Sequence, residues 1–150
     1  LPLFFITQIL DVTYLNKLKF SKAEIAKILL LRKWHHSLKK KSIVEFNELE
    51  RFQLHQDLEM FLPSFIFYLP QKIRIDWLKR WRDKDDKLFH PSNLINGDVI
   101  KKNLEIKDGP ILGKLLHYLS MELAYKRLDN FDEAIYKARL WIEQNAPKCD

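Results

Sequence analysis

The chain has 150 residues, of which 47% are hydrophobic and 13% aromatic, and its formal net charge is +6. This apolar content is enough for a core and argues against disorder, while the basic surplus favours an anionic partner such as nucleic acid or an anionic membrane face. The one cysteine, Cys149, excludes an internal disulfide and a cysteine-rich zinc site, and it suits the reducing cytoplasm. The apolar opening LPLFFITQIL is too short to span a bilayer, which needs about 20 residues.

Two helix signals stand near the start of the chain. Proline is favoured in a first helical turn, so a helix is expected over residues 2–15. Ser21 and Glu24 have the spacing of a capping box, and the apolar residues after them recur at three- and four-residue steps. This pattern predicts a second helix that ends near Lys40, where lysines suit the negative end of the helix dipole.

Prolines divide the middle of the chain. A helix is expected over residues 44–62, and Pro63 should break or kink it because proline cannot donate a backbone hydrogen bond. Residues 71–85 form the next expected helix, with tryptophans and cations on opposite faces. Its apolar face holds Ile73, Trp77 and Trp81. Its cationic face holds Lys72, Lys79 and Arg82, which are candidate contacts for RNA.

The last third of the chain is divided by turn signals. The pair Asn96-Gly97 marks a turn, and Asp98 is expected to cap a short helix over residues 99–104. The run Asp108-Gly109-Pro110 is expected to begin another helix, because proline suits the first helical position. Residues 130–133 resemble a further capping pair, which predicts the final helix.

These elements predict an all-α fold. No segment shows sustained period-two alternation, which argues against strands. A charged loop with Pro91 separates the helices into two groups. We therefore expect a multi-helix bundle, with a larger N-terminal bundle over residues 1–85 and a smaller C-terminal helical lobe over residues 86–150.

The sequence offers little for catalysis. Phosphate-loop, dinucleotide-binding and nucleophile-elbow motifs are absent. His35 and His36 are adjacent, so on a helix they point about 100° apart and cannot bind one ion from one face. The acidic run 83–86 is interleaved with lysine and follows no strand signal, so we interpret it as a solvated loop. We predict no catalytic residue, no metal site and no cofactor in this chain.

A candidate phosphate site lies where the helix after Asp108 begins. Its residues are Gly109, Pro110, Gly113 and Lys114. They give a helix start with little side-chain bulk and a lysine, and a helix start presents N–H groups and a positive dipole end to phosphate. Lys101 and Lys102 are expected to line the same ligand. Spacing alone favours a simpler interpretation, in which Gly113 only lets another helix pack closely.

The last part of the chain also carries three motifs at a fixed spacing. The first has the form Pro-x-x-Leu-Ile-x-Gly-Asp, with Pro91, Leu94, Ile95, Gly97 and Asp98. The second has the form Gly-Pro-x-x-Gly-x-Leu-Leu, with Gly109, Pro110, Gly113, Leu115 and Leu116. The third is the pair Glu133 and Ala134, which begins the last helix. This region resembles the C-terminal region of bacterial class II tRNA nucleotidyltransferases, the CCA-adding enzymes, and of related poly(A) polymerases. Residues 18–28 more weakly resemble the middle part of the same enzymes.

The resemblance implies a modular enzyme. A head region would hold the catalytic carboxylates with Mg²⁺ and would bind ATP and CTP, while a helical body and tail would hold tRNA. This chain resembles body (1–85) and tail (86–150) alone, because the glycine-rich start with its Asp-x-Asp pair, which the family needs for catalysis, does not occur in it. Lys126 stands near a position where many relatives have glycine, so the turn before the last helix is expected to differ.

The leading hypothesis is a cytoplasmic, tRNA-binding part of an enzyme that adds CCA, CC or A to tRNA 3′ ends. Because the chain does not begin with methionine, we expect it to be a piece of a longer protein. One alternative is a helical interaction or oligomerisation module without an RNA role, suggested by the aromatic-rich stretch Phe61–Tyr68. Another is a metal-dependent hydrolase built on His35, His36 and Asp85.

Overall fold

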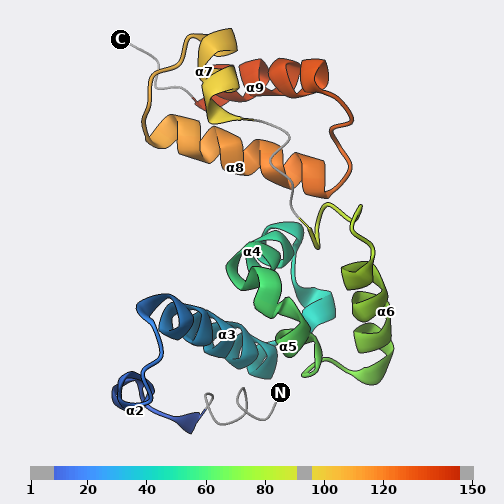
Figure 1. Ribbon diagram of the computed structural model, residues 1–150. Coiled ribbons are helices and arrows are strands. Elements are labelled where there is room, and N and C mark those ends of the chain that lie inside the picture. Colours follow the sequence, from blue (N-terminus) through green and yellow to red (C-terminus); the bar gives the residue numbers. More distant parts are fainter. Residues whose placement is uncertain (1–8, 91–95, 146–150) are drawn as a thin grey trace. The chain divides into compact units, whose positions relative to one another are not determined.

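Helices make up the regular structure of this chain in the computed structural model (Figure 1). The structure describes residues 9–90 and 96–145, and within these ranges there is no β-strand. The chain divides into two compact units, residues 1–84 and residues 85–150. The expected all-α class, with a larger bundle followed by a smaller lobe, is confirmed. Among the described helices, none has both the length and the apolar content that crossing a membrane requires.

The start of the first unit differs from expectation. The proposed helix over residues 2–15 lies partly outside the described residues, and the described part is not one continuous helix. Asp11 has extended backbone, and its side chain accepts a hydrogen bond from the amide of Val12, so a new helix, α2, begins there and covers Val12–Lys17. A carboxylate that caps its own following turn competes with helix continuation, which explains the break.

Helix α3, Lys22–Lys40, has the predicted start and the predicted buried face. The Ser21 amide donates to Glu24 Oε2 at 2.8 Å, and the Glu24 amide donates to Ser21 Oγ at 3.2 Å, which completes the capping box. The buried residues of the helix are Ile25, Ile28, Leu31 and Trp34, as their three-residue steps predict.

The expected single helix over residues 44–62 is wrong. The structure has a 3₁₀ turn over Ile43–Glu45, helix α4 over Glu48–Leu58, a 3₁₀ turn over Glu59–Phe61 and helix α5 over Leu62–Ile66. The break falls at Glu59, whose φ is 44°, and not at Pro63. Lys27 Nζ supports this bend, because it donates to the Asp57 carbonyl at 3.1 Å and to Glu59 Oε2 at 2.9 Å. Pro63 instead stands in the first turn of α5, where its missing N–H is not needed.

Helix α6, Gln71–Arg82, packs through the predicted tryptophan face. Trp77 is buried, and its ring lies 5.0 Å from the ring of the buried His55 and 6.5 Å from that of Phe65. The core beneath it consists of side chains with no exposed area, namely Phe52, Leu54, Leu58, Leu62, Phe65 and Ile66. Three residues of the aromatic-rich stretch Phe61–Tyr68, namely Leu62, Phe65 and Ile66, therefore belong to the core of this unit, whereas Phe67 is 42% exposed.

The second unit consists of α7, Gly97–Leu104, α8, Pro110–Ala124, and α9, Phe131–Asn145, which contact one another (Figure 1). Their shared core contains Ile100, Leu112, Leu115, Leu119, Leu128, Ala134 and Ala138. The expected cap of α7 is wrong: Asn96 caps it by accepting from the Asp98 amide at 3.0 Å, and the helix begins at Gly97. Asn130 caps α9 as predicted, because its Oδ1 accepts from the Glu133 amide at 2.9 Å.

The turn between α8 and α9 is held by a buried carboxylate. Glu122 is 7% exposed, and its two oxygens bind Arg127 Nε and Lys137 Nζ, each at 2.7 Å. Lys137 also donates to the Arg127 carbonyl at 2.6 Å. Lys126, the residue expected to reshape this turn, has a φ of 55°. That backbone conformation is one that glycine adopts freely and other residues adopt at a cost, and Lys126 holds it next to Arg127, which binds Glu122.

We predict that Glu122→Gln destabilises the second unit by about 1–3 kcal/mol. Glutamine keeps the shape of the side chain but leaves Arg127 and Lys137 without their shared counter-charge. The measurement is hydrogen–deuterium exchange of the α8 and α9 amides, which should become faster. Glu143→Gln, the same change at an exposed position of α9, is the control. Equal exchange in both variants would show that the buried ion pairs do not stabilise the turn.

Candidate nucleic-acid interface

The start of α8 is open to solvent and has no side-chain cap. Gly109 is the N-cap residue with extended backbone, Pro110 stands in the first turn, and both are exposed. Because Gly109 has no side chain, it cannot accept a hydrogen bond from the amides of the first turn, and that turn contains no acidic residue. The first amides of a helix have no partner inside the helix, so this end offers N–H donors and a positive dipole end to an anion.

Gly113 does not serve close packing. A Cβ atom added to it would meet nothing within 4 Å, and the residue is exposed. The simpler interpretation from spacing, that Gly113 lets another helix approach, is therefore wrong for the described residues. Gly97 has that role instead, because a Cβ there would lie 3.3 Å from Leu116 Cδ1. Lys114 follows Gly113 on α8 and is also exposed, so the predicted glycine and lysine share an accessible helix start.

Lys101 and Lys102 differ in their surroundings. Lys101 Nζ lies 2.7 Å from Asp98 Oδ1 and 3.0 Å from Asp108 Oδ1, and these hydrogen bonds, that to Asp98 first, raise the pKa of Lys101. Its charge is thus shared with two carboxylates, one of which directly precedes Gly109. Lys102 is exposed in the last turn of α7, and within the described part of the chain no ion pair joins it.

The cationic face of α6 is also exposed as expected. Lys72, Lys79 and Arg82 all face solvent in the first unit, away from the buried Trp77. Asp76 shares this face, four residues after Lys72 and three before Lys79, so it offsets part of their charge. These residues and the α8 start belong to different units. That one ligand contacts both groups stays a prediction.

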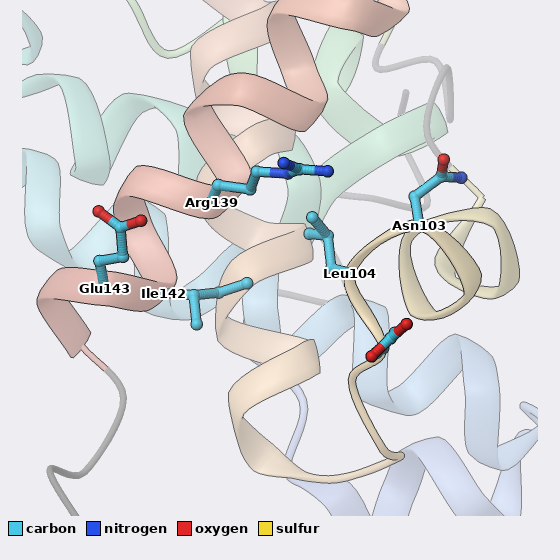
Figure 2. Close-up of a pocket in the computed structure, with 6 residues that line it drawn as sticks. Asn103, Leu104, Arg139, Ile142 and Glu143 are labelled. Atoms are coloured by element: carbon cyan, nitrogen blue, oxygen red, sulfur yellow. The ribbon is translucent and has the colours of Figure 1, made fainter.

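The second unit has another hollow, with a different character. It is about 340 Å³ in volume and lies between the end of α7 and α9 (Figure 2). Its lining residues are Asn103, Leu104, Glu105, Arg139, Ile142 and Glu143. Two carboxylates and one guanidinium make this surface acidic on balance, so it does not suit a phosphate group.

A cleft in the first unit was not expected from the sequence. It lies between the end of α3 and the segment that joins α5 to α6, and Lys39 and Lys40 line it opposite Tyr68. The lysine run 39–41 is visible in the sequence. Nothing in the sequence pattern, however, indicates that Tyr68 faces it, because this pairing depends on the bend at Glu59 and on the packing of α5.

The residues proposed for a metal-dependent hydrolase do not form a metal site. Within residues 9–90 and 96–145, no three His, Cys, Asp or Glu side chains are grouped closely enough to hold an ion. The His35 ring instead lies 4.1 Å from that of Tyr68. In the acidic run, Asp86 Oδ1 accepts from the amides of Leu88 and Phe89 at 3.1 and 3.2 Å, so it stabilises a turn.

Comparison with known proteins gives one informative match. Over 134 residues the chain is 25% identical to a CC-adding tRNA nucleotidyltransferase of Synechocystis sp., a stretch that covers 83% of this chain. This similarity supports a relation to the tRNA nucleotidyltransferases. The chain spans 32% of the length of that protein. No family model matches the chain, and no solved structure matches it. Among the motif residues that carry the resemblance, Pro91, Leu94 and Ile95 lie outside the described residues, whereas Gly97 and the α8 residues lie within them.

We predict that Gly113→Ala stabilises the second unit by about 0.5–1 kcal/mol, because alanine fits the helix and loses less chain entropy on folding. Urea unfolding of the two proteins measures the difference. Gly97→Ala is the matched comparison and should gain less, since its new methyl group would press on Leu116. A loss of stability in Gly113→Ala would contradict the open surroundings of this residue.

We predict that His35 makes the stability of the first unit depend on pH. Burial first, and then the charges of Lys39 and His36, lower its pKa below the ordinary value of 6.5. The unfolded chain therefore binds the proton first as pH falls below 6.5, and stability is lost between that value and the lower folded pKa. Urea unfolding between pH 7.5 and 5, as a rough range, should show a weaker pH slope in His35→Gln. His117→Gln, a histidine change in the second unit, is the control. An equal slope in His35→Gln and the unmodified chain would contradict the assignment.

Proposed function

We propose that this chain is the tRNA-binding, helical part of a tRNA nucleotidyltransferase. The observation that carries the proposal is the similarity over 134 residues to a CC-adding tRNA nucleotidyltransferase. The exposed, uncapped start of α8 supports it, because the motif residues Gly109, Pro110 and Gly113 leave room there for a phosphate. The net charge of +6 also favours a polyanion.

Recognition in this proposal rests on the RNA backbone. A protein that must accept many tRNAs gains from contacts to phosphates, to 2′-hydroxyls and to overall shape, which do not depend on base sequence. Lys114 and Lys102 would bind phosphate beside the α8 start, and Lys72, Lys79 and Arg82 would do so on α6. Lys101 would act chiefly by holding Asp108, so that this carboxylate repels the ligand less.

Bond formation is assigned to another part of the enzyme. Among the described residues no cluster of ligands suits a metal ion, so we place no Mg²⁺ site in them. The Mg²⁺, ATP and CTP that nucleotide addition requires would bind in a catalytic head. The role on tRNA also agrees with the cytoplasmic location expected from the sequence.

The test is a salt series of tRNA binding with Lys114→Glu. We expect roughly tenfold weaker binding of a tRNA transcript, and a salt slope smaller by about 0.7–0.9 because one phosphate is no longer neutralised by lysine. Lys126→Glu is the matched control, because this exposed lysine follows the other end of α8. Circular dichroism checks that both variants keep their helices.

Two outcomes would count against the proposal. Equal affinity of Lys114→Glu and Lys126→Glu would remove the α8 start from the interface. Absence of tRNA binding, or binding that salt does not weaken, would instead favour the protein-interaction module as the function of this chain.

A further inference from the structure

The cleft in the first unit is framed by two segments that are distant in the sequence. It has a volume of about 470 Å³. One wall is the last turn of α3 with the turn that follows, and the other is the segment between α5 and α6. The first wall contributes Leu38, Lys39, Lys40, Lys41, Ser42, Ile43 and Glu45, and the second contributes Tyr68, Leu69 and Pro70.

Some of the charged side chains that line this cleft form ion pairs or hydrogen bonds, and others form no ion pair among the described residues. Lys41 Nζ binds both carboxylate oxygens of Glu50 at 2.6 and 2.7 Å and lies 5.0 Å from the centre of the Phe46 ring. Glu45 Oε2 accepts from the Ser42 amide at 2.6 Å, so this carboxylate is directed at the backbone. Lys39 and Lys40 are exposed, and among the described residues no carboxylate forms an ion pair with either of them.

The apolar lining of the cleft is partly covered: Pro70 is exposed, and Leu38 is half-buried. Ile43 is 3% exposed and Leu69 is 2% exposed, so both already serve the protein core. Tyr68 is half-buried, with its ring against that of His35. A peptide that docks by its side chains needs open apolar pockets for anchor residues. A ligand held mainly by charge does not, and lysines bind phosphate as point charges.

We propose that this cleft binds the phosphate backbone of an RNA strand through Lys39 and Lys40. The inference rests on the proposed function and adds to it a binding surface that lies in the first unit, apart from the motif region in α8. Lysines at the end of a helix also balance its dipole. That role needs neither a cleft nor a facing wall, and the cleft supplies both.

The experiment compares two double variants of the full 150-residue chain. Lys39→Gln with Lys40→Gln removes the two proposed phosphate ligands. Lys17→Gln with Lys22→Gln removes the same charge at exposed positions of α2 and of the opposite end of α3. Binding of a tRNA transcript is measured over a salt series. We expect the cleft variant to bind several-fold more weakly, with a slope smaller by about 0.7–0.9 for each phosphate that lysine no longer binds, and the control to stay close to the unmodified chain.

A local readout separates direct binding in the cleft from a general decrease in charge. The His35 ring lies against Tyr68, and Lys39 is one of the charges that lower its pKa. A phosphate beside Lys39 offsets that repulsion, so titration with a short oligouridylate followed by histidine NMR should raise the pKa of His35. The cleft variant should show no such rise on adding the oligonucleotide.

The outcomes distinguish this inference from the proposed function. If Lys114→Glu weakens tRNA binding and the cleft variant behaves as its control, the cleft is overturned and the proposed function stands. If the unmodified chain does not bind tRNA, both fall together. If an acidic peptide displaces the oligouridylate at lower concentration than tRNA does, the cleft is a protein-docking site and the inference is also overturned.

Discussion

Every α-helix begins with backbone N–H groups that have no partner inside the helix. In this chain, side chains occupy those groups at some helix starts, and at other starts the groups stay accessible to a ligand. Side chains cap α3, α4, α7 and α9, and the capping residues are Ser21, Asn47, Asn96 and Asn130. Each of these helices also has an acidic residue in its first turn. The starts of α5, α6 and α8 have neither feature, and those of α6 and α8 are each followed by an exposed lysine. An anion is therefore repelled from the capped starts and attracted to these two.

A buried carboxylate fixes the turn between α8 and α9 in the second unit, at the end of α8 that lies away from its accessible start. Glu122 ties the end of α8 to α9 through Arg127 and Lys137, and this occurs at the end of α8 opposite Gly109. The left-handed backbone of Lys126 belongs to the same arrangement. The resemblance predicted that a lysine near this place would alter the turn. The backbone of Lys126 takes a conformation that glycine adopts freely, beside the ion pairs of Glu122, and a difference from the turn of relatives stays a prediction.

The sequence predicted features that depend on neighbours within one turn. Capping at Ser21 and Asn130 and the buried face of α6 follow from residues three or four apart, and all three were predicted correctly. The bend at Glu59 was missed because Lys27, which supports it, lies on another helix. The cap of α7 was placed at Asp98 because aspartate and asparagine are near-equal caps and the register cannot be read from preference alone.

The candidate site also contains features that local sequence patterns could not predict, because they depend on contacts between helices. Glycine at 97 and glycine at 113 look alike in the sequence, yet one lies against Leu116 and the other faces open space. Which glycine is open depends on how α7 packs on α8. The ion pair between Lys101 and Asp108 could not be predicted from the sequence either, because Asp108 reaches Lys101 only when the segment before α8 folds back toward α7. The helix start itself was predictable, since Gly109 and Pro110 are adjacent.

The distribution of unmatched cations bears on the kind of anion that the proposed interface suits. Lys102 and Lys114 in one unit, and Lys39, Lys40, Lys72 and Lys79 in the other, have exposed side chains. One phosphate bound by such a lysine in water gains little, because solvent and salt screen the attraction. A folded RNA presents many phosphates on one rigid frame, so several weak contacts add within a single binding event. The proposed function therefore suits a large polyanion such as tRNA better than a nucleotide or a free phosphate. Under that proposal, selectivity would come from the spacing of several weak contacts and not from the strength of any one.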